Sequence, residues 1–579
     1  MTIFAGVFAL APNRSISSET SAELVKAISR DLADQPVLHA FPGCVIAFLD
    51  LGLLPGSGEV ADACGARSFL AGDVLLKPRS SASRSDDLRT LHEAWLAGSD
   101  APLRAARGSF AVAQFDPAKG QLRLAVDVLG ARPLYVAFSD GFVYFATALR
   151  ILESLTALKK RMDLRGLLEM SAFGFPLSTR TQYEGLDLLD GCEALRVDRS
   201  SGVSRYKYWQ WDELETDGRS RDELSRSLYQ SFRDAVKWRL GDQTSVVSLF
   251  SGGLDSRCVT ASLLAEGATV HSINIAPEGS LDLVLGRQAA DHLGTRHFEF
   301  SKGPADGMQR IGEGHKAWLA ASSADDELPP FPGSAWTGTG GSVGMGHVYI
   351  DDTMIALMQQ GRRSDAVRAY LRKNRIELSS KAFRRSLQRS VEACCYDGVL
   401  EQLQQHGSFD EGRRLHLFLM LNDQRRHLTG LYEDIDRYRF EMINPFFDTE
   451  FLRLVLAAPV EPFLAHRLYN VWLKEFPFAL DSVPWQAYDD HEPGPLPMPE
   501  GLKGQWEQGF YAEQVIKDAS KQLLAKSRAA LSSAHFPAYV LRGPALRAAW
   551  WATWAGLGDY SYLLKLASSW TDYASRART

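Results

Sequence analysis

The sequence predicts an α/β protein of two domains, and three observations support this fold class. Short apolar runs separated by Gly, Pro and Asp turns fill the first 200 residues, which is typical of a largely antiparallel domain. Between residues 245 and 300, predicted strands and helices alternate. The chain has 579 residues, which is too many for one ordinary core. We therefore expect two domains, at residues 1–210 and 211–579.

Five apolar runs with strand character predict the first domain. Turn residues bound each of them, and they are 44–48, 108–115, 121–126, 134–138 and 142–145. Helical spacing of apolar residues predicts helices over 19–32 and 86–97. The polar stretch 212–221 follows the domain boundary and opens a helix that ends near Leu240.

The order of the elements in the second domain indicates a parallel sheet. Strands are predicted at 245–250, 269–275 and 296–300, with helices at 254–266 and 281–293 between them. This alternation requires crossover connections, which place helices on both faces of the sheet. After residue 350 the chain is predicted to be mostly helical, with a Trp-rich helical tail at Ala548–Trp554.

The composition excludes several functional classes. A net charge of −6 gives no general attraction to nucleic acid or to acidic lipid. The six cysteines have no CxxC or other metal-ligand spacing, and no apolar run approaches the roughly 18 residues that span a bilayer. We expect a soluble, cytoplasmic protein that binds neither nucleic acid nor membranes.

One motif carries most of the chemical information. The stretch SLFSGGLDSR (Ser248–Arg257) lies at a predicted strand–loop–helix corner, and in a parallel sheet such a corner leads into a helix N-terminus that favours an anion. Gly252 and Gly253 let backbone amides approach phosphate oxygens, and Ser251 and Ser256 add hydroxyl donors. The alternative is that these residues only cap the helix.

The aspartate of this motif requires a separate explanation. A carboxylate that faces phosphate oxygens repels them unless a divalent cation lies between, so we predict Asp255 as a Mg²⁺ ligand. We also assign Leu249 and Asn274, near the ends of the first two predicted strands of this domain, to the nucleotide site.

The motif SGGLDS resembles the pyrophosphate-binding loop of the asparagine synthetase superfamily, whose members cleave ATP between the α- and β-phosphates. It lacks the Lys-Ser/Thr ending of a Walker P-loop. The stretches DVLGARPLYVA (Asp127–Ala137), FVYFATALRIL and SFLAGDVLL resemble the class II glutamine amidotransferase domain, an αββα sandwich. Such domains use an N-terminal Cys nucleophile, whereas position 2 is Thr here, so the resemblance implies a domain without that nucleophile. The alternative is that Thr2 acts as an amine-activated hydroxyl.

A second glycine-rich stretch, AWTGTGGSVGMGHVY (Ala335–Tyr349), stands where the superfamily has an SGEGADE-like loop. Gly338 and Gly340 keep its backbone pattern and are assigned to the nucleotide site. Ser342 replaces the carboxylate expected to bind a second Mg²⁺. We predict Asp351, with its neighbour Asp352, as the possible substitute ligand, and the alternative is that these are two solvated acids at a strand end.

Two further stretches indicate which group within the superfamily the sequence resembles. DRYRFEMINPFFD (Asp436–Asp448) matches a family segment except at Ile443, where the family has Arg, and VPWQAYDDHEPGPLP (Val483–Pro497) follows it. Together with the missing Cys, these stretches look most like the lasso peptide cyclases, macrolactam synthetases that join a peptide's N-terminal amine to an Asp or Glu side chain. The resemblance implies ATP and Mg²⁺ as cofactors. It implies a lasso precursor or core peptide, a leader peptidase and a precursor-recognition protein as partners.

The implied reaction needs a base and a peptide pocket. ATP would adenylate the acceptor carboxylate, and the attacking amine must be neutral. Glu433, Tyr432 and Asp436 are the candidates for this role, and the alternative is that the acids only pair with arginines. Trp485 and Tyr488 are predicted to line the peptide pocket, although aromatic residues often belong to the core.

Other functions stay open at this point. A β-lactam synthetase-like enzyme or an ammonia-dependent asparagine synthetase would use the same chemistry on a small molecule. A non-catalytic binding protein built on a decayed synthetase is a third reading, because Thr339 and Ser342 stand at acidic positions.

Overall fold

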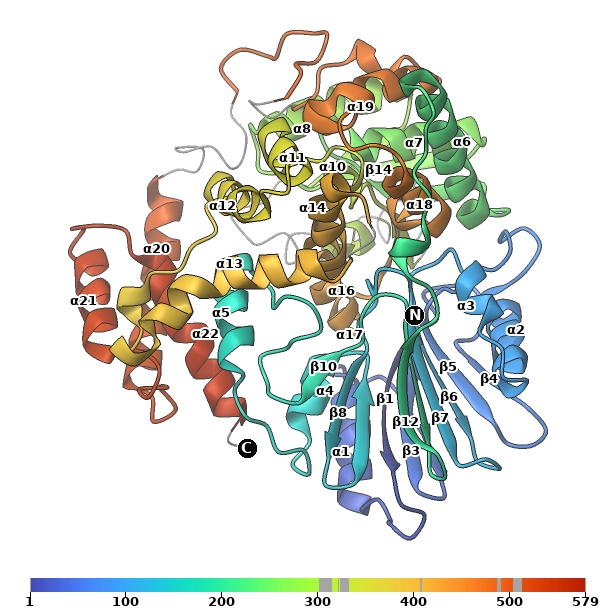
Figure 1. Cartoon of the computed structure of the whole chain (residues 1–579). Coiled ribbons are helices and arrows are strands. Elements are labelled where there is room, and N and C mark those ends of the chain that lie inside the picture. The colour runs from blue at the N-terminus through green and yellow to red at the C-terminus, as the bar shows by residue number, and fades with distance from the viewer. Residues whose placement is uncertain are drawn as a thin grey trace.

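The computed structural model describes residues 2–300, 315–320, 322, 333–406, 409–486, 491–502 and 513–577. It contains two antiparallel six-stranded sheets and one parallel five-stranded sheet. In Figure 1 the strands of the two antiparallel sheets, blue to cyan, gather at one end of the molecule, and the green helices α6–α8 lie at the other.

Both antiparallel sheets lie within residues 2–207. The first has the order β10-β8-β9-β1-β3-β2, with strands Leu186–Leu188, Tyr135–Ser139, Phe142–Ala146, Thr2–Ala9, Cys44–Asp50 and Val37–Phe41. The second has the order β12-β11-β7-β6-β5-β4, with strands Gly202–Lys207, Glu193–Asp198, Gln121–Val126, Phe110–Asp116, Arg67–Gly72 and Glu59–Ala61. All five predicted strands are confirmed. The remaining strands were missed, and among them β1 is buried at every residue and shows no alternation that would reveal a strand.

The two sheets pack face to face around an aromatic core. Phe8 of β1 contacts Phe115 of β6 at a ring-centroid distance of 6.0 Å, and Phe48 of β3 contacts Phe69 of β5 at 5.3 Å. Successive residues of a strand point to opposite faces, so the outer faces also need cover. Helix α1 (Ser18–Ile28) packs on β3 and α2 (Arg84–Leu96) on β4 and β5. This layering confirms the predicted αββα sandwich.

The third sheet is parallel, as predicted. Its order is β15-β14-β13-β16-β17, with strands Arg296–Glu299, Thr269–Asn274, Ser245–Leu249, Ser334–Trp336 and Glu441–Ile443. Val246 and Val247 belong to different hydrophobic clusters, so both faces of the sheet are covered. The three-residue strands β16 and β17 were not predicted, because they are too short to show a period.

Helices make up most of the remaining chain. Those of the first 207 residues, besides α1 and α2, are α3 Ala101–Ala105, α4 Leu149–Ser154 and α5 Leu164–Phe173. Those around the parallel sheet are α6 Arg221–Leu240, α7 Asp255–Ala265, α8 Leu281–Leu293, α10 Gly341–Gly344, α11 Asp352–Gln359, α12 Arg363–Lys373, α13 Gln388–Gln404, α14 Glu411–Leu419, α15 Arg425–His427, α16 Thr429–Glu433, α17 Ile435–Tyr438, α18 Thr449–Ala457 and α19 Arg467–Trp472.

The chain ends in three helices, α20 Glu513–Ser532, α21 Gly543–Trp554 and α22 Ser561–Ala577. They lie beside α5 and α13 in Figure 1 and share a hydrophobic cluster with them. The predicted helical tail is confirmed as α21. No helix in the described part of the chain is both long and apolar enough to cross a membrane.

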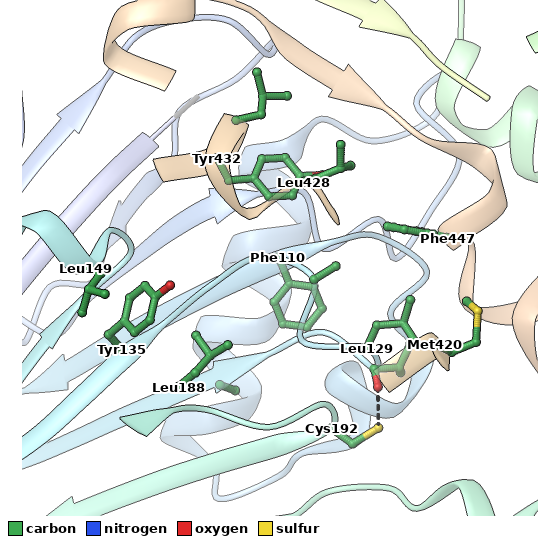
Figure 2. Close-up of a cluster of buried hydrophobic side chains, with 14 of the residues drawn as sticks. Phe110, Leu129, Tyr135, Leu149, Leu188, Cys192, Met420, Leu428, Tyr432 and Phe447 are labelled. Atoms are coloured by element: carbon green, nitrogen blue, oxygen red, sulfur yellow. Dashed lines mark hydrogen bonds between the residues drawn. The ribbon is translucent and has the colours of Figure 1, made fainter. Parts of the chain in front are cut away.

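Residues from both halves of the chain build one continuous hydrophobic cluster. Figure 2 shows Phe110, Leu129 and Tyr135 from the antiparallel sheets and their connections next to Tyr432 and Phe447 from the segment around β17. Such a shared core fixes the two halves against each other.

Buried ion pairs cross the same interface. The Asp448 carboxylate is fully buried and accepts hydrogen bonds from Arg107 Nη2 at 2.9 Å and from Arg239 Nη1 at 2.7 Å. Arg132 Nη2 donates to Glu441 Oε1 at 2.7 Å, and both of these residues are also buried. Because an unpaired buried charge is costly, these pairs require accurate docking of the two halves.

The Asp448 network predicts a large loss of stability on truncation. Asp448→Ala leaves Arg107 and Arg239 without their buried partner, and we expect it to lower the free energy of unfolding by about 3–5 kcal/mol. The exposed pair Arg362–Asp365 provides the control, because Asp365→Ala should cost less than about 1 kcal/mol. Urea unfolding of both variants measures the difference, and equal losses would contradict the assignment.

Candidate nucleotide-binding site

The candidate site lies at the carboxyl edge of the parallel sheet. The loop after β13 runs from Phe250 to Leu254 and leads into α7 at Asp255. Strand β16 pairs with β13 through Trp336 and Ser248, so the glycine-rich loop after β16 lies beside the first loop. The predicted strand–loop–helix corner is confirmed. Among the described residues, no side chain donates or accepts a capping hydrogen bond at the N-terminus of α7. This weighs against the alternative that Ser251–Ser256 serve only to cap the helix.

Small donors and acceptors close around the loop. Ser251 N donates to Ser256 Oγ at 3.1 Å, and the two hydroxyl oxygens lie 3.0 Å apart. Gly253 N donates to Ser251 Oγ at 3.3 Å. Gly252 N donates to a carboxylate oxygen of Asp282, on the first turn of α8, at 2.9 Å. One amide of the loop, Gly252 N, therefore already donates to an anionic oxygen, which is the property that phosphate binding needs.

Asp282 was not found from the sequence. Its carboxylate holds the Gly252 amide, and its backbone oxygen accepts from Asn274 Nδ2 at 3.1 Å. A bound phosphate and this carboxylate would compete for the same amide. In the sequence, Asp282 is visible only as an acid in the first turn of α8, the helix after β14. Acids are common at helix N-termini, so this position does not mark a binding residue.

Both oxygens of the Asp255 carboxylate are held by hydroxyl donors. Ser342 Oγ donates to Oδ2 at 2.6 Å and Tyr469 Oη donates to Oδ1 at 2.7 Å. Removal from water raises the pKa of Asp255, and these two hydrogen bonds offset part of that effect. Ser342, which the sequence resemblance puts at the position of a carboxylate, therefore positions Asp255. Tyr469 was missed, since it lies 214 residues away along the chain.

The glycine pattern of the second loop has a steric cause. A Cβ on Gly338 would overlap the backbone at Asp255 and Ser256, and a Cβ on Gly341 would overlap the Asp255 carboxylate. Gly340 has φ +95°, a left-handed conformation that favours glycine, and its added Cβ would overlap Phe447. The two loops are packed so closely that only hydrogen fits at these positions.

The other residues assigned to the nucleotide have different surroundings. Leu249 ends β13 and Asn274 ends β14, so both lie at the carboxyl edge of the sheet. Asn274 is buried, and its Oδ1 has no hydrogen-bond partner among the described residues. This oxygen is an acceptor that a ligand at the edge could use.

The structure gives Asp351 another set of contacts. Its side chain caps α11 by accepting from Met354 N at 3.0 Å, and it pairs with Lys373 at 3.2 Å. None of its contacts involves Asp255. No group of three or more His, Cys, Asp or Glu side chains suited to a metal occurs among the described residues. A metal at this corner would therefore rest on Asp255 and on oxygens of the ligand, and Asp351 as a ligand stays a prediction.

Trp485 and Tyr488 are the two aromatic residues predicted to line the peptide pocket. Trp485 is buried, 2% exposed, and the guanidinium of Arg257 on α7 lies 5.9 Å from its ring centroid. Gln486 N donates to Gly252 O at 3.4 Å, so this segment runs along the first loop. Tyr488 lies outside the described residues.

The three base candidates lie at the interface between the two halves of the chain. Tyr432 is buried, and the Arg132 guanidinium sits 3.9 Å from its ring centroid. Burial of Asp436 would raise its pKa, but hydrogen bonds from Arg30 and the nearby charge of Arg150 outweigh it and lower the pKa. None of the contacts of these residues joins them to the Ser251–Ser256 loop, and Asp436 fits the alternative of an acid paired with arginines.

Glu433 differs from its neighbours. It is partly buried, and loss of contact with water raises the pKa of its carboxyl to about 7. The Tyr135 hydroxyl, from β8, donates a hydrogen bond to it. A pKa near neutrality suits a general base, but the same hydrogen bond occupies the carboxylate at the interface, and a catalytic role stays a prediction.

The packing at Asp255 predicts opposite outcomes for two neighbouring glycines. Gly341→Ala drives a methyl group into the Asp255 carboxylate, so we expect it to weaken binding of Mg²⁺-ATP at least tenfold. Gly344→Ala is the matched control, because its Cβ would meet only Met420 Cε at 3.8 Å, an ordinary contact. Calorimetric titration with nucleotide distinguishes them, and equal affinities would show that the Asp255 geometry does not matter for binding.

Glu433 also predicts a pH dependence. Its folded pKa of about 7 lies above the unfolded value of about 4.3. Its favourable contribution is therefore present at low pH and is lost as the pH rises from about 4 through about 7. Relative to Glu433→Gln, the wild-type protein should lose a few kcal/mol of stability over that range. Thermal melts across the range measure it, and the surface variant Glu184→Gln should show no such trend.

Comparisons with known proteins agree with this geometry. The model of the glutamine amidotransferase domain matches residues 75–209, and the asparagine synthase model matches residues 227–325. Human asparagine synthetase (glutamine-hydrolyzing) is 28% identical over 218 residues, 36% of this chain and 37% of that protein. Asparagine synthetase (glutamine-hydrolyzing) 2 of Arabidopsis thaliana is 29% identical over 225 residues, 36% of this chain and 32% of that protein.

The aligned stretch thus spans only about a third of the length of these relatives. A solved structure of glutamine phosphoribosylpyrophosphate amidotransferase from Bacillus subtilis aligns with 54% of this chain and 92% of its own at 11% identity, with a TM-score of 0.23. In this chain a segment similar to the glutamine amidotransferase domain is therefore followed by a segment similar to asparagine synthase.

Proposed function

We propose that this protein is an ATP-dependent, AMP-forming carbon–nitrogen ligase that closes a macrolactam ring in a lasso peptide. The observation that carries the ligase assignment is the corner at Ser251–Ser256. Its amides and hydroxyls converge at the carboxyl edge of a parallel sheet, beside a buried glycine loop. That edge is where open α/β sheets bind their ligands.

The corner suits the departure of pyrophosphate. A carboxylate does not condense with an amine at neutral pH until it carries a good leaving group, and adenylation supplies one. Gly252 N and Ser251 Oγ would stabilise charge on the leaving group once a phosphate displaces Asp282 from the Gly252 amide. Asp255 is the carboxylate that would hold Mg²⁺, and the ion would neutralise the charge of the phosphates.

The surroundings of Thr2 support a donor other than glutamine. Its hydroxyl is buried, 1% exposed, and accepts a hydrogen bond from Arg84 Nη2 at 2.7 Å. Arg84 is equally buried and also donates to Gly72 O and Leu70 O. A hydroxyl enclosed in this way is poorly placed to attack an external substrate. The nitrogen would then come from an amine, and the resemblance to lasso peptide cyclases identifies it as the N-terminus of the core peptide.

The site residues divide the remaining work. The peptide's acceptor carboxylate would approach the corner from the side of Trp485 and Gln486, which border the first loop. The ring of a lasso peptide must close around the tail of the same peptide, so the pocket has to order a flexible chain. Ordering costs about 1–2 kcal/mol of conformational free energy per residue. A precursor-recognition protein and a leader peptidase would deliver the leaderless core peptide.

Two alternative functions would use the same fold. A β-lactam synthetase-like or ammonia-dependent asparagine synthetase-like enzyme would use the same corner on a small molecule. A non-catalytic binding protein would use the fold without turnover, and Thr339 and Ser342 at acidic positions of the family favour that reading. The hydrogen bond from Ser342 to Asp255 weighs against it, because the substituted residue still supports the carboxylate.

The test is incubation of the full chain with ATP, Mg²⁺ and a leaderless lasso core peptide. We expect AMP, pyrophosphate and a peptide lighter by one water, detected by mass spectrometry. Pyrophosphate release with small carboxylates only would favour the small-molecule ligase. No turnover with any carboxylate would favour the binding protein.

Ser251→Ala tests the corner itself. Removing one fixed donor should reduce the rate of pyrophosphate release by about 10²-fold or more and leave the melting temperature nearly unchanged. Ser227→Ala on the surface of α6 is the control. If Ser251→Ala releases pyrophosphate at the wild-type rate, the corner takes no part in the reaction.

A further inference from the structure

A second cavity lies between the two halves of the chain. Its volume is about 580 Å³, within the usual range for small-molecule sites. The first half contributes the segments around Gly72 and Ser81–Arg84, and the second contributes Arg239–Gln243 and Glu441–Asn444. No residue of the Ser251–Ser256 loop lines it, whereas Tyr432, one of the base candidates, does, so it is separate from the nucleotide corner.

Acids and arginines line this cavity in equal numbers. Four arginines line it, and each is paired with an acid: Arg79 with Asp73 and Asp87, Arg84 with Asp50, Arg132 with Glu441, and Arg239 with Asp448. Two further lining acids, Asp86 and Asp242, have no ion pair among the described residues, but both are exposed to water, and Asp86 accepts hydrogen bonds from Ser83. The arginines on the wall are therefore already compensated by acids.

Two buried side chains on the wall of the cavity have unused hydrogen-bonding atoms. Glu441 is 3% exposed, and its Oε1 accepts from Arg132 whereas its Oε2 has no partner among the described residues. Asn444 is 6% exposed, and both its Oδ1 and its Nδ2 lack partners in the same part of the chain. Buried polar atoms are usually paired, so three unpaired ones on a single cavity wall point to a ligand.

We propose that this cavity binds a small organic cation with a primary ammonium or guanidinium group. The N–H donors of such a group match the two free acceptors, Glu441 Oε2 and Asn444 Oδ1, and its positive charge suits the free oxygen of the buried Glu441 carboxylate. Asn444 Nδ2 can meet a carbonyl or hydroxyl on the same ligand. Charge-assisted hydrogen bonds of this kind are stronger than neutral ones.

The site does not depend on the reaction proposed above. It can be tested without nucleotide, and its failure would leave the ligase assignment untouched. It does depend on the docking of the two halves, since the lining acids come from α2 and from the segments after α6 and around β17.

The probe is agmatine, which carries a guanidinium and an ammonium group. Calorimetric titration of the full chain should show saturable binding, whereas glutarate, an anion of similar length, should not bind. Glu441→Gln and Asn444→Leu should each weaken agmatine binding about tenfold or more. Glu450→Gln, an exposed acid on α18, is the matched control and should bind as the wild type does.

Folding of the variants needs its own check, because Glu441 is the partner of Arg132. Asn444 precedes Pro445 in an extended conformation that leucine also adopts, so Asn444→Leu keeps the test valid if Glu441→Gln melts early. The proposal is overturned if the wild type shows no saturable heat up to roughly 10 mM agmatine. It is also overturned if folded Asn444→Leu binds agmatine as tightly as the wild type.

Discussion

The buried carboxylate of Asp448 links the parts on which the rest of the structure depends. It accepts hydrogen bonds from Arg107 of the antiparallel half and from Arg239 of α6, and it caps α18 through Glu450 N and Phe451 N. A charge with no access to water is tolerated only when all these partners are in place. The preceding residue, Phe447, packs directly on Gly340. The interface thereby fixes the glycine-rich loop, and that loop in turn fixes Asp255.

At the candidate site itself, the Asp255 carboxylate is held by close packing and by neutral donors. Ser342 and Tyr469 hold both oxygens of Asp255, and neutral donors leave its charge available to a cation. The Gly252 amide already holds an anionic oxygen from Asp282. A phosphate must therefore displace Asp282 from this amide before the corner can stabilise a leaving group. Ser342 contributes one of these donors and leaves the carboxylate of Asp255 in place.

The first half of the chain has the αββα layers of an amidotransferase-type domain. At the start of β1, the Thr2 hydroxyl is buried beside Arg84. Arg84 fills the space beside the Thr2 hydroxyl and bonds three backbone or side-chain oxygens there. What remains open is the cavity toward the synthetase half, whose wall carries Glu441 and Asn444. A domain of this kind can serve as a rigid wall for a second binding site, because its core and its ion pairs already hold it against the parallel sheet.

The sequence by itself determined the local elements and the central motif. Strand Gln121–Val126, helix Leu281–Leu293 and the corner before Asp255 follow from periodicity and turn residues, which act over a few neighbours along the chain. Only the tertiary structure decided which distant side chains meet. Tyr469 and Asp282 at the loops, and Arg30 at Asp436, are brought there by packing between elements far apart in sequence. A pattern within one segment carries no record of such contacts, because they arise only when separate elements are buried against each other.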